Sequence, residues 1–237
     1  MASLSSNADA DLAAMGALIG DPARARMLLA LLDGSARPAS ELAMLGGVSR
    51  PTASLHLAKL VEGGLLEVER RGRHRYFRLA GPEVGRALEA LAAISPPLPA
   101  RSLRAAQQGE ALRLARMCYD HLAGRLGVAL TERLLELGWL VESAGAFDLT
   151  ARGHQRLARW GIDVDGLRRQ RRRFAFPCLD WSERKHHLAG ALGAALASRL
   201  LDLDWIRRVP RTRAVRLTGA GHRGLAEVFG LELEFEQ

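Results

Sequence analysis

The clearest change in the pattern of apolar and polar positions lies in residues 47–80, where a helical period gives way to a strand period. Ala53, Leu57 and Leu60 recur at helical spacing and form one apolar stripe, while the opposite stripe is mostly polar and basic. Ser49 is a favoured helix-capping residue, and the proline two positions later suits a first helical turn. The sequence therefore predicts a short helix with one face toward a core and the other toward solvent.

A strand pattern follows this helix directly. Leu66 and Val68 on one side, and Tyr76 and Arg78 on the other, alternate about the tip Arg70-Arg71-Gly72-Arg73-His74-Arg75. Such alternation about a turn is typical of a two-stranded hairpin, and this hairpin has a positively charged tip. A helix with one polar face followed by an arginine-tipped hairpin is an arrangement that proteins use to read DNA.

Helix signals surround this segment on both sides. We expect a helix over residues 9–19, a second from Asp21-Pro22 onward, a short third over ELAML after Ser40, and another from Pro82 through EVGRALEALAAI. The proline cluster from Ser95 to Pro99 predicts a linker. We therefore expect a first domain over residues 1–95 and a second over residues 101–237.

The order of these elements resembles the winged helix-turn-helix of bacterial repressors of the ArsR/SmtB type. The segments that carry the resemblance are DPARARMLLALLDG, SELAMLGGVSRPTASLHLAKLVEGGLL and RRGRHRYFRL. The resemblance implies a homodimer that is joined through its first and last helices and binds a double-stranded DNA operator. The metal ligands of that family are absent from their usual places: ELAMLGG has no cysteine pair, and EVGRALEALAAI has no histidine or aspartate.

The second half of the chain contains an internal repeat. The segment HLAGRLGVALTERLLELGWL from His121 matches HLAGALGAALASRLLDLDWI from His187, and the two copies span residues 121–164 and 187–232. Each copy reads as a helix, a strand pair and a further helix, which is itself a winged-helix-like pattern. The predicted fold is therefore mainly α with small β-wings: a winged helix-turn-helix followed by a duplicated, winged-helix-like region.

The candidate DNA-binding residues lie on the polar face of the helix and at the tip of the hairpin. They are Arg50, Thr52, Ser54, His56, Lys59, Arg73 and Arg75. Side chains of these types contact base edges in the major groove, or phosphates; the alternative is an ordinary solvated helix face. Leu55 lies on the same face, where a thymine-methyl contact and simple shielding both stay open. A second basic run, from Arg168 to Arg173, is of a kind that more often forms a solvated face.

Two cysteines and several histidines occupy matching places in the repeat. The candidate metal ligands are Cys118, His121, Cys178 and His187, with His186 and Asp180 nearby. Thiolates and imidazoles together suit a zinc-like ion, and we expect Cys118 and His121 to share a helical face at i, i+3. The alternatives are a redox disulfide, a small-molecule pocket, or two buried apolar cysteines without a cofactor, with the aspartates that follow each cysteine capping or pairing locally.

Composition narrows the choice of protein class. The chain has 237 residues, a formal net charge of +8 and 48% hydrophobic residues. Basic and acidic residues nearly balance up to residue 94, so DNA binding would depend on local placement rather than overall charge. Two cysteines are too few for a disulfide framework, no basic segment precedes the first apolar stretch, and the apolar run Leu188–Leu201 is too short to span a membrane. We therefore expect a soluble cytoplasmic protein.

Motifs for catalysis are missing from the sequence. It has no glycine-rich phosphate loop and no nucleophile elbow, so we expect no enzyme. The sequence predicts a DNA-binding transcriptional regulator that is sequence-specific and acts as a repressor. We expect it to be controlled by a small-molecule, metal or redox signal that is sensed in the second domain. The alternative is an architectural or protein-interaction module that binds DNA without sequence preference.

Overall fold

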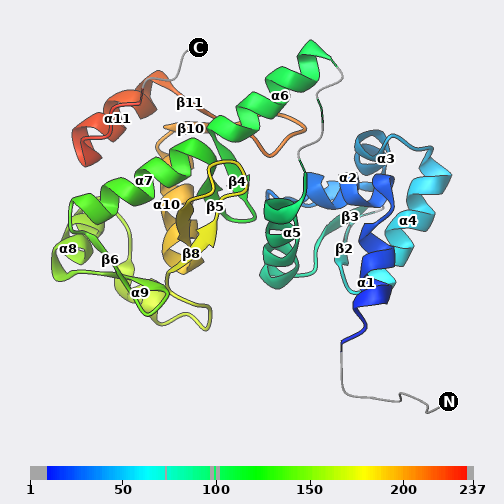
Figure 1. Ribbon diagram of the computed structural model, residues 1–237, viewed down its shortest axis with the longest axis horizontal. Helices are drawn as coiled ribbons and strands as arrows, with labels where there is room; N and C mark the ends of the chain where they lie inside the picture. The colour runs from blue at the N-terminus through cyan, green and yellow to red at the C-terminus, as the bar shows by residue number, and fades with distance from the viewer. Residues whose placement is uncertain (1–9, 73, 97–98, 100–101, 234–237) are drawn as a thin grey trace. The chain divides into compact units, whose positions relative to one another are not determined.

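Figure 1 shows the computed structural model of the protein, which describes residues 10–72, 74–96, 99 and 102–233. The described residues form two compact units, one from residues up to 31 and 35–84, the other from residues 32–34 and from 85 onward. Part of the expected proline linker, Pro97 and Leu98, lies outside the described residues. The domain boundary at residues 95–101 therefore stays a prediction.

The first unit is a winged helix-turn-helix, as predicted. Its elements are α1 (Leu12–Ile19), α2 (Pro22–Ala30), β1 (Arg37–Pro38), α3 (Ala39–Gly46), α4 (Arg50–Glu62), β2 (Leu66–Arg71) and β3 (His74–Leu79). The three strands form an antiparallel sheet in the order β1-β3-β2, and the hairpin of β2 and β3 is the wing. The helix α5 (Pro82–Ile94) begins in the first unit and continues in the second.

Local capping explains where these helices begin and end. The Asp21 side chain accepts hydrogen bonds of 2.9 Å from two backbone N–H groups at the start of α2, where Pro22 needs no donor. Ser49 caps α4 in the same way by accepting from the Thr52 N–H at 3.3 Å. Gly47 ends α3 with a φ of 69°, a left-handed conformation that glycine adopts without strain. Gly47 and Ser49 together fix the turn between α3 and α4.

The core of the first unit contains the apolar stripe predicted for α4. Its buried side chains include Met27, Leu28, Leu42, Ala53, Leu57, Leu60, Phe77 and Leu79. They come from α2, α3, α4 and the inner face of the wing, so each of these elements has one buried side. Burial of one side leaves the opposite face of α4 exposed, and this exposed face is the one predicted to read DNA.

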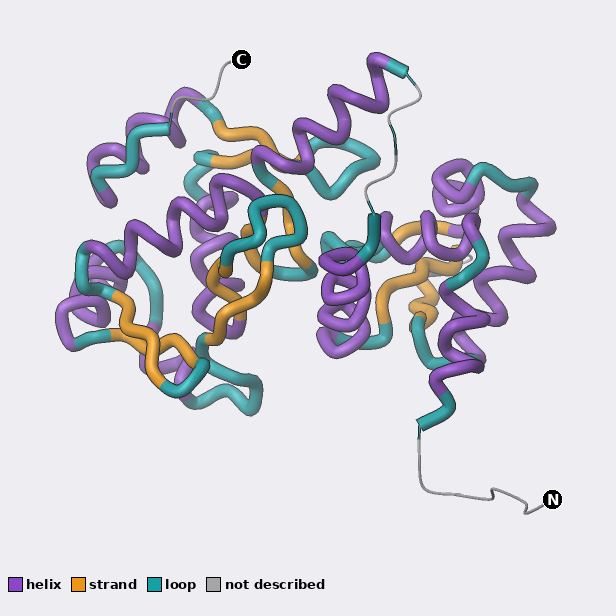
Figure 2. Tube along the Cα trace, in the orientation of Figure 1, coloured by secondary structure: helices purple, strands orange, loops and turns teal. Residues whose placement is uncertain are grey.

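The second unit repeats one sequence of elements: strand pair, helix, strand pair, helix (Figure 2). After α6 (Leu103–Leu114), the first copy contains β4 (Arg116–Cys118), β5 (His121–Ala123), α7 (Gly124–Glu136), β6 (Leu140–Ser143), β7 (Ala146–Leu149) and α8 (Ala151–Arg159). A short α9 (Val164–Arg168) leads to the second copy, which contains β8 (Phe176–Leu179), β9 (His186–Ala189), α10 (Gly190–Asp202), β10 (Ile206–Arg208), β11 (Val215–Leu217) and α11 (Gly219–Phe229).

The two copies exchange their packing partners. The helix α7 of the first copy packs against β9 of the second, and α10 of the second copy packs against β5 of the first. The buried leucines Leu126, Leu130 and Leu134 of α7 belong to the same core cluster as Leu192 and its helical neighbours in α10. One hydrophobic core therefore serves both copies, and neither copy completes its own core.

Close approach of helix and strand requires glycine at Gly193 of α10. A Cβ atom at this position would lie 2.3 Å from the Leu188 carbonyl oxygen and 3.2 Å from the His121 Cβ.

No helix in the described part of the chain is long and apolar enough to cross a membrane.

We predict that Gly193→Ala lowers the free energy of unfolding by roughly 1–3 kcal/mol, because the added methyl group overpacks the α10–strand contact. Gly109→Ala in α6 is the matched control, since a Cβ atom added there would have nothing within 4 Å, and alanine favours a helix interior. Urea denaturation of both variants measures the difference. An equal effect of the two substitutions would contradict the packing argument.

Candidate functional site

The helix α4 presents the residues predicted to contact DNA on its solvent side. Arg50, Thr52, Ser54 and Lys59 are exposed, and Leu55 between them is 68% exposed. Thr52 is also engaged locally, because its hydroxyl lies 2.8 Å from that of the capping Ser49. The exposed face therefore combines two hydroxyl groups, two cationic side chains and one large apolar side chain.

His56 differs from the other predicted DNA contacts of α4 because its side chain is not fully exposed. It is half-buried, with its Nδ1 3.2 Å from Arg24 Nη1 and its Nε2 4.0 Å from Asp21 Oδ1. The pKa of Asp21 is lowered, chiefly by the hydrogen bond from the Arg24 backbone and further by the nearby His56 and Arg24 charges. His56 thus connects α4 to the start of α2, a supporting contact that the helical period did not reveal.

The charged side chains of the wing are paired differently on its two faces. Arg71 forms an ion pair with Glu69 at 3.0 Å and Arg78 one with Glu67 at 2.8 Å. Arg70 and Arg75 lie directly opposite each other in the strand register, and neither has an ion pair with a described residue.

Two like charges in this position repel each other unless an anion lies between or beside them. Arg70 and Arg75 share a face with the buried Phe77 and Leu79, but they lie exposed at the end nearer the turn, and this end of the wing is therefore suited to phosphate. The other predicted wing contact, Arg73, lies outside the described residues.

The second unit brings the four predicted thiol and imidazole side chains together in a Cys–His cluster, defined as Cys118, His121, Cys178 and His187. One ligand atom from each residue lies within 4.8 Å of all the others. The two Sγ atoms are 4.0 Å apart, and the two imidazole centroids are 5.1 Å apart. The four residues are buried except Cys178, which is half-buried.

The strand register explains this convergence. Cys118 of β4 lies opposite His121 of β5, and Cys178 of β8 lies opposite His187 of β9. The expectation that Cys118 and His121 share a helical face was wrong. They lie on paired strands because the two residues between them form a tight turn, in which Tyr119 has a φ of 60°.

The two neighbouring candidates do not join the cluster. His186 is exposed and lies opposite Leu179 in the strand register. Asp180 is fully buried and already engaged: it accepts hydrogen bonds from the Gly124 N–H at 2.7 Å and the Ser182 hydroxyl at 2.8 Å. Asp180 is therefore a supporting residue rather than a ligand.

Asp180 also forms a fully buried ion pair with Arg116 of β4, at 2.9 Å. Burial by itself opposes ionisation of Asp180, but interactions with His187, Arg116 and Ser182 outweigh it and hold the pKa of this carboxyl below its usual range. A negative charge on Asp180 also suits its place beside the N-terminus of α7.

A carboxylate lies beside the Nδ1 atom of each imidazole ring. His121 Nδ1 lies 3.1 Å from Asp120 Oδ1, and Asp120 is itself hydrogen-bonded by Arg172 at 2.6 Å. His187 Nδ1 lies 3.4 Å from Asp180 Oδ2. The Nε2 atoms of both histidines, and Nδ1 of His187, are buried and have no hydrogen-bond partner among the described residues. The sequence signal for this support was the Cys-x-Asp motif, which occurs once before each copy of the repeat.

The environment of the two thiols favours a single shared thiolate. The hydrogen bond between them lowers the pKa of Cys178, and His121 and His187 lower it further, although burial acts in the opposite direction. The same hydrogen bond, together with burial, raises the pKa of Cys118. Since thiolates are the form that binds metals and attacks disulfides, the cluster is chemically poised for ligation.

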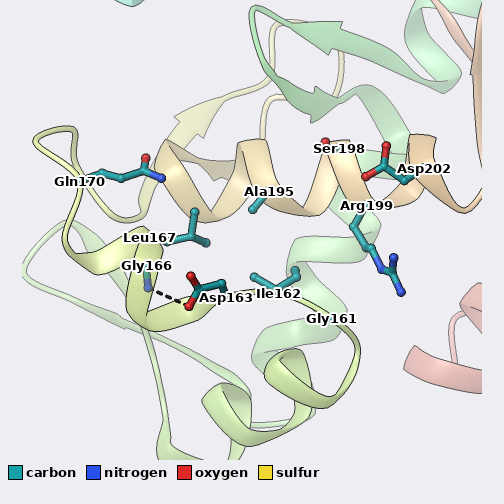
Figure 3. Close-up of a pocket in the computed structure, with 10 residues that line it drawn as sticks. All are labelled: Gly161, Ile162, Asp163, Gly166, Leu167, Gln170, Ala195, Ser198, Arg199 and Asp202. Carbon is teal, nitrogen blue, oxygen red and sulfur yellow. Dashed lines mark hydrogen bonds between the residues drawn. The ribbon is translucent and has the colours of Figure 1, made fainter.

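A separate pocket lies elsewhere in the second unit. Figure 3 shows this open cavity of about 500 Å³, which is lined by residues 161–170 and by α10. Two of its charged side chains are already engaged, since Asp163 accepts from the Gly166 N–H at 2.9 Å and Arg199 donates to the Trp160 carbonyl at 3.0 Å. Gln170, Ser198 and Asp202 complete its polar lining, and these side chains alone do not identify a ligand.

The basic run from Arg168 to Arg173 is mostly engaged within the second unit. Arg168 pairs with Asp148 and stacks on Phe174 at 4.1 Å, while Arg173 stacks on Phe176 at 4.5 Å. Together with the Arg172 pair described above, these contacts support the structural interpretation of the run.

The first unit is similar to known helix-turn-helix proteins. A family model described as a helix-turn-helix domain matches residues 19–69. Similar solved structures include the homodimeric winged helix-turn-helix domain Mb0332 from Mycobacterium bovis, with 28% identity, 37% of this chain and 88% of that chain covered, and a TM-score of 0.33. The cadmium sensor CMTR from Mycobacterium tuberculosis has 34% identity, covering 38% of this chain and 99% of that chain, with a TM-score of 0.30.

A curated relative matches both units. The chain is 45% identical over 211 residues to YdfF of Bacillus subtilis (strain 168), described as an uncharacterized HTH-type transcriptional regulator, and the match covers 89% of this chain and 93% of that protein. The identity extends far beyond the helix-turn-helix itself, so the duplicated region is shared as well. With this identity over nearly its whole length, the chain belongs to the HTH-type transcriptional regulators.

Proposed function

We propose that this regulator is a sequence-specific repressor of the ArsR type, which binds a double-stranded operator as a homodimer and responds to a signal sensed in its second unit. The observation that carries the proposal is the exposed polar face of α4 together with Arg70 and Arg75 of the wing, which have no ion pair with a described residue. These two surfaces belong to one compact unit, as a groove-reading helix and its flanking wing require.

The helix α4 is the proposed major-groove reader. The hydroxyl group of Ser54 donates to or accepts from base edges, and the exposed Leu55 is suited to a thymine methyl group. Arg50 and Lys59, at the two ends of this face, are suited to phosphates or guanine. His56 acts at least in part by holding α4 against Arg24 and Asp21.

The wing supplies the backbone contacts. Arg75, with Arg70 opposite, contacts phosphates or enters the minor groove, and the sequence predicts the same role for Arg73. Since basic and acidic residues nearly balance in the first 94 positions, binding depends on these few side chains. This balance favours sequence-specific reading over an architectural protein that coats DNA without preference.

Exposed apolar side chains support the homodimer. Leu12 of α1 is 77% exposed, and α1 has no buried residue. In α5, Leu91 and Ile94 are exposed as well. These are the two helices that the family resemblance assigns to subunit pairing, and a second copy of the chain would cover them. In a dimer, a signal in the second unit would act by shifting the population in which the two α4 helices match half-sites one turn apart.

We predict that the protein binds DNA from its own upstream region more tightly than scrambled DNA, and that Ser54→Ala reduces this discrimination by about 1–3 kcal/mol for the base pair it contacts. Competition titrations with single-base operator variants measure the effect. Glu62→Ala, an exposed substitution in the last turn of α4, is the control and leaves discrimination intact. Equal affinity for operator and scrambled DNA would contradict sequence-specific reading.

We predict that Arg75→Ala weakens binding to all DNA sequences by a similar factor and reduces the slope of log affinity against log salt by about 1, because one phosphate contact is lost. Arg78→Ala is the matched control on the same strand, where the guanidinium is already paired with Glu67. Anisotropy titrations between about 50 and 200 mM salt measure both slopes. An unchanged slope for Arg75→Ala would exclude its phosphate contact.

We predict that His56→Ala lowers the free energy of unfolding by about 0.5–1.5 kcal/mol, because its contacts with Arg24 and Asp21 are lost. Urea denaturation measures this effect without DNA present. A variant with unchanged stability and weaker operator binding would instead show that His56 acts only by contacting DNA.

A further inference from the structure

We propose that the Cys–His cluster binds one thiophilic divalent cation of the zinc class per chain, and that this ion joins the two copies of the repeat. The cluster lies wholly within the second unit. The proposal therefore goes beyond DNA binding and stands whether or not the first unit recognises an operator.

The donor set identifies the class of ion. Two thiols and two imidazoles form the Cys₂His₂ set that structural zinc sites use, while calcium and magnesium require oxygen ligands. The protein supplies four ligands, so a tetrahedral ion would have no open position for a substrate. The site is therefore of the closed kind that stabilises or regulates a fold.

The spacing of the donor atoms fits a tetrahedron. Sulfur ligands at about 2.3 Å and nitrogen ligands at about 2.0–2.1 Å from zinc are separated from one another by about 3.3–3.8 Å. The two Sγ atoms are 4.0 Å apart, and all four donors lie within 4.8 Å. A disulfide instead requires the two sulfurs to approach to about 2.05 Å. Metal ligation therefore needs the smaller displacement.

The histidines are oriented as ligands. Asp120 lies against Nδ1 of His121, and Asp180 lies against Nδ1 of His187, at 3.1 and 3.4 Å. A carboxylate on the far nitrogen of a ligating histidine is the usual outer support of a metal site. The Nε2 atoms, left buried without partners among the described residues, are the nitrogens available to bind the ion. Buried polar atoms without partners are rare and call for an explanation, and a bound ion supplies one.

The position of the site gives the ion a structural role. The strand pair at the start of each copy contributes one cysteine and one histidine, which lie opposite each other in register. The strands β5 and β9 lie next to each other and also contact the exchanged helices α10 and α7. An ion at this place would link residues far apart in sequence at the centre of the shared core, so its binding is coupled to the stability of the second unit.

Metal binding by the full-length chain tests the proposal. Reduced protein, stripped of metal with a chelator, is titrated with Co²⁺ as a spectroscopic probe and then with Zn²⁺. We expect one Co²⁺ per chain with thiolate-to-metal and tetrahedral ligand-field absorption, full displacement by Zn²⁺, and a higher thermal midpoint for the loaded protein. A reduced wild-type protein that binds neither ion would overturn the proposal.

Single substitutions locate the ion. Cys178→Ser and His187→Gln are expected to weaken binding by more than about 100-fold, and Asp120→Asn by about 10–100-fold with a tetrahedral spectrum retained. His186→Gln, the neighbouring exposed histidine on β9, is the matched control and leaves affinity and stoichiometry unchanged. Equal losses for His186→Gln and His187→Gln would show that the ion binds elsewhere.

A measurement on the wild-type chain keeps the test decisive where a variant fails to fold. Zn²⁺ is expected to slow alkylation of Cys178, the half-buried thiol, at least about tenfold, since ligation removes its free thiolate. Unchanged alkylation rates in the presence of stoichiometric Zn²⁺ would overturn the proposal. So would a Cys118–Cys178 disulfide in freshly isolated protein whose reduced form takes up no ion.

Discussion

A single buried carboxylate, that of Asp180, organises the centre of the second unit. It caps the start of α7 through Gly124, holds the turn after β8 through Ser182, and neutralises the fully buried Arg116 of β4. Removal of one partner from such a pair leaves an uncompensated buried charge, which costs far more than the pair contributes on its own. Asp180 also faces His187, so the geometry of the Cys–His cluster depends on the same carboxylate.

The first unit is stabilised in a different way from the second. Its fold depends on short-range features: capping side chains at Asp21 and Ser49, a left-handed glycine at Gly47, and one apolar stripe on α4. The side chains proposed to contact DNA are those that lie outside this core. Charge adds little here, so placement of a few side chains matters more than overall attraction to DNA.

Much of this architecture could be predicted from sequence, because the signals are local or repeated. Helical period, caps and hairpin alternation identified α4 and the wing, and the repeat placed Cys118 and Cys178 at matching positions. The strand pair that holds Cys118 and His121 was missed, since three-residue strands are too short for alternation to show. The supporting role of His56 was missed because it depends on Arg24, 32 residues away.

The exchanged packing of α7 with β9 and of α10 with β5 also constrains synthesis of the chain. A growing polypeptide can complete the winged helix-turn-helix soon after it leaves the ribosome, since the contacts there are local. The helix α7 of the first copy, by contrast, lacks its contact with β9 until the second copy has been made. Until then part of its leucine face stays uncovered, which makes this interval the one in which the nascent chain is most open to aggregation.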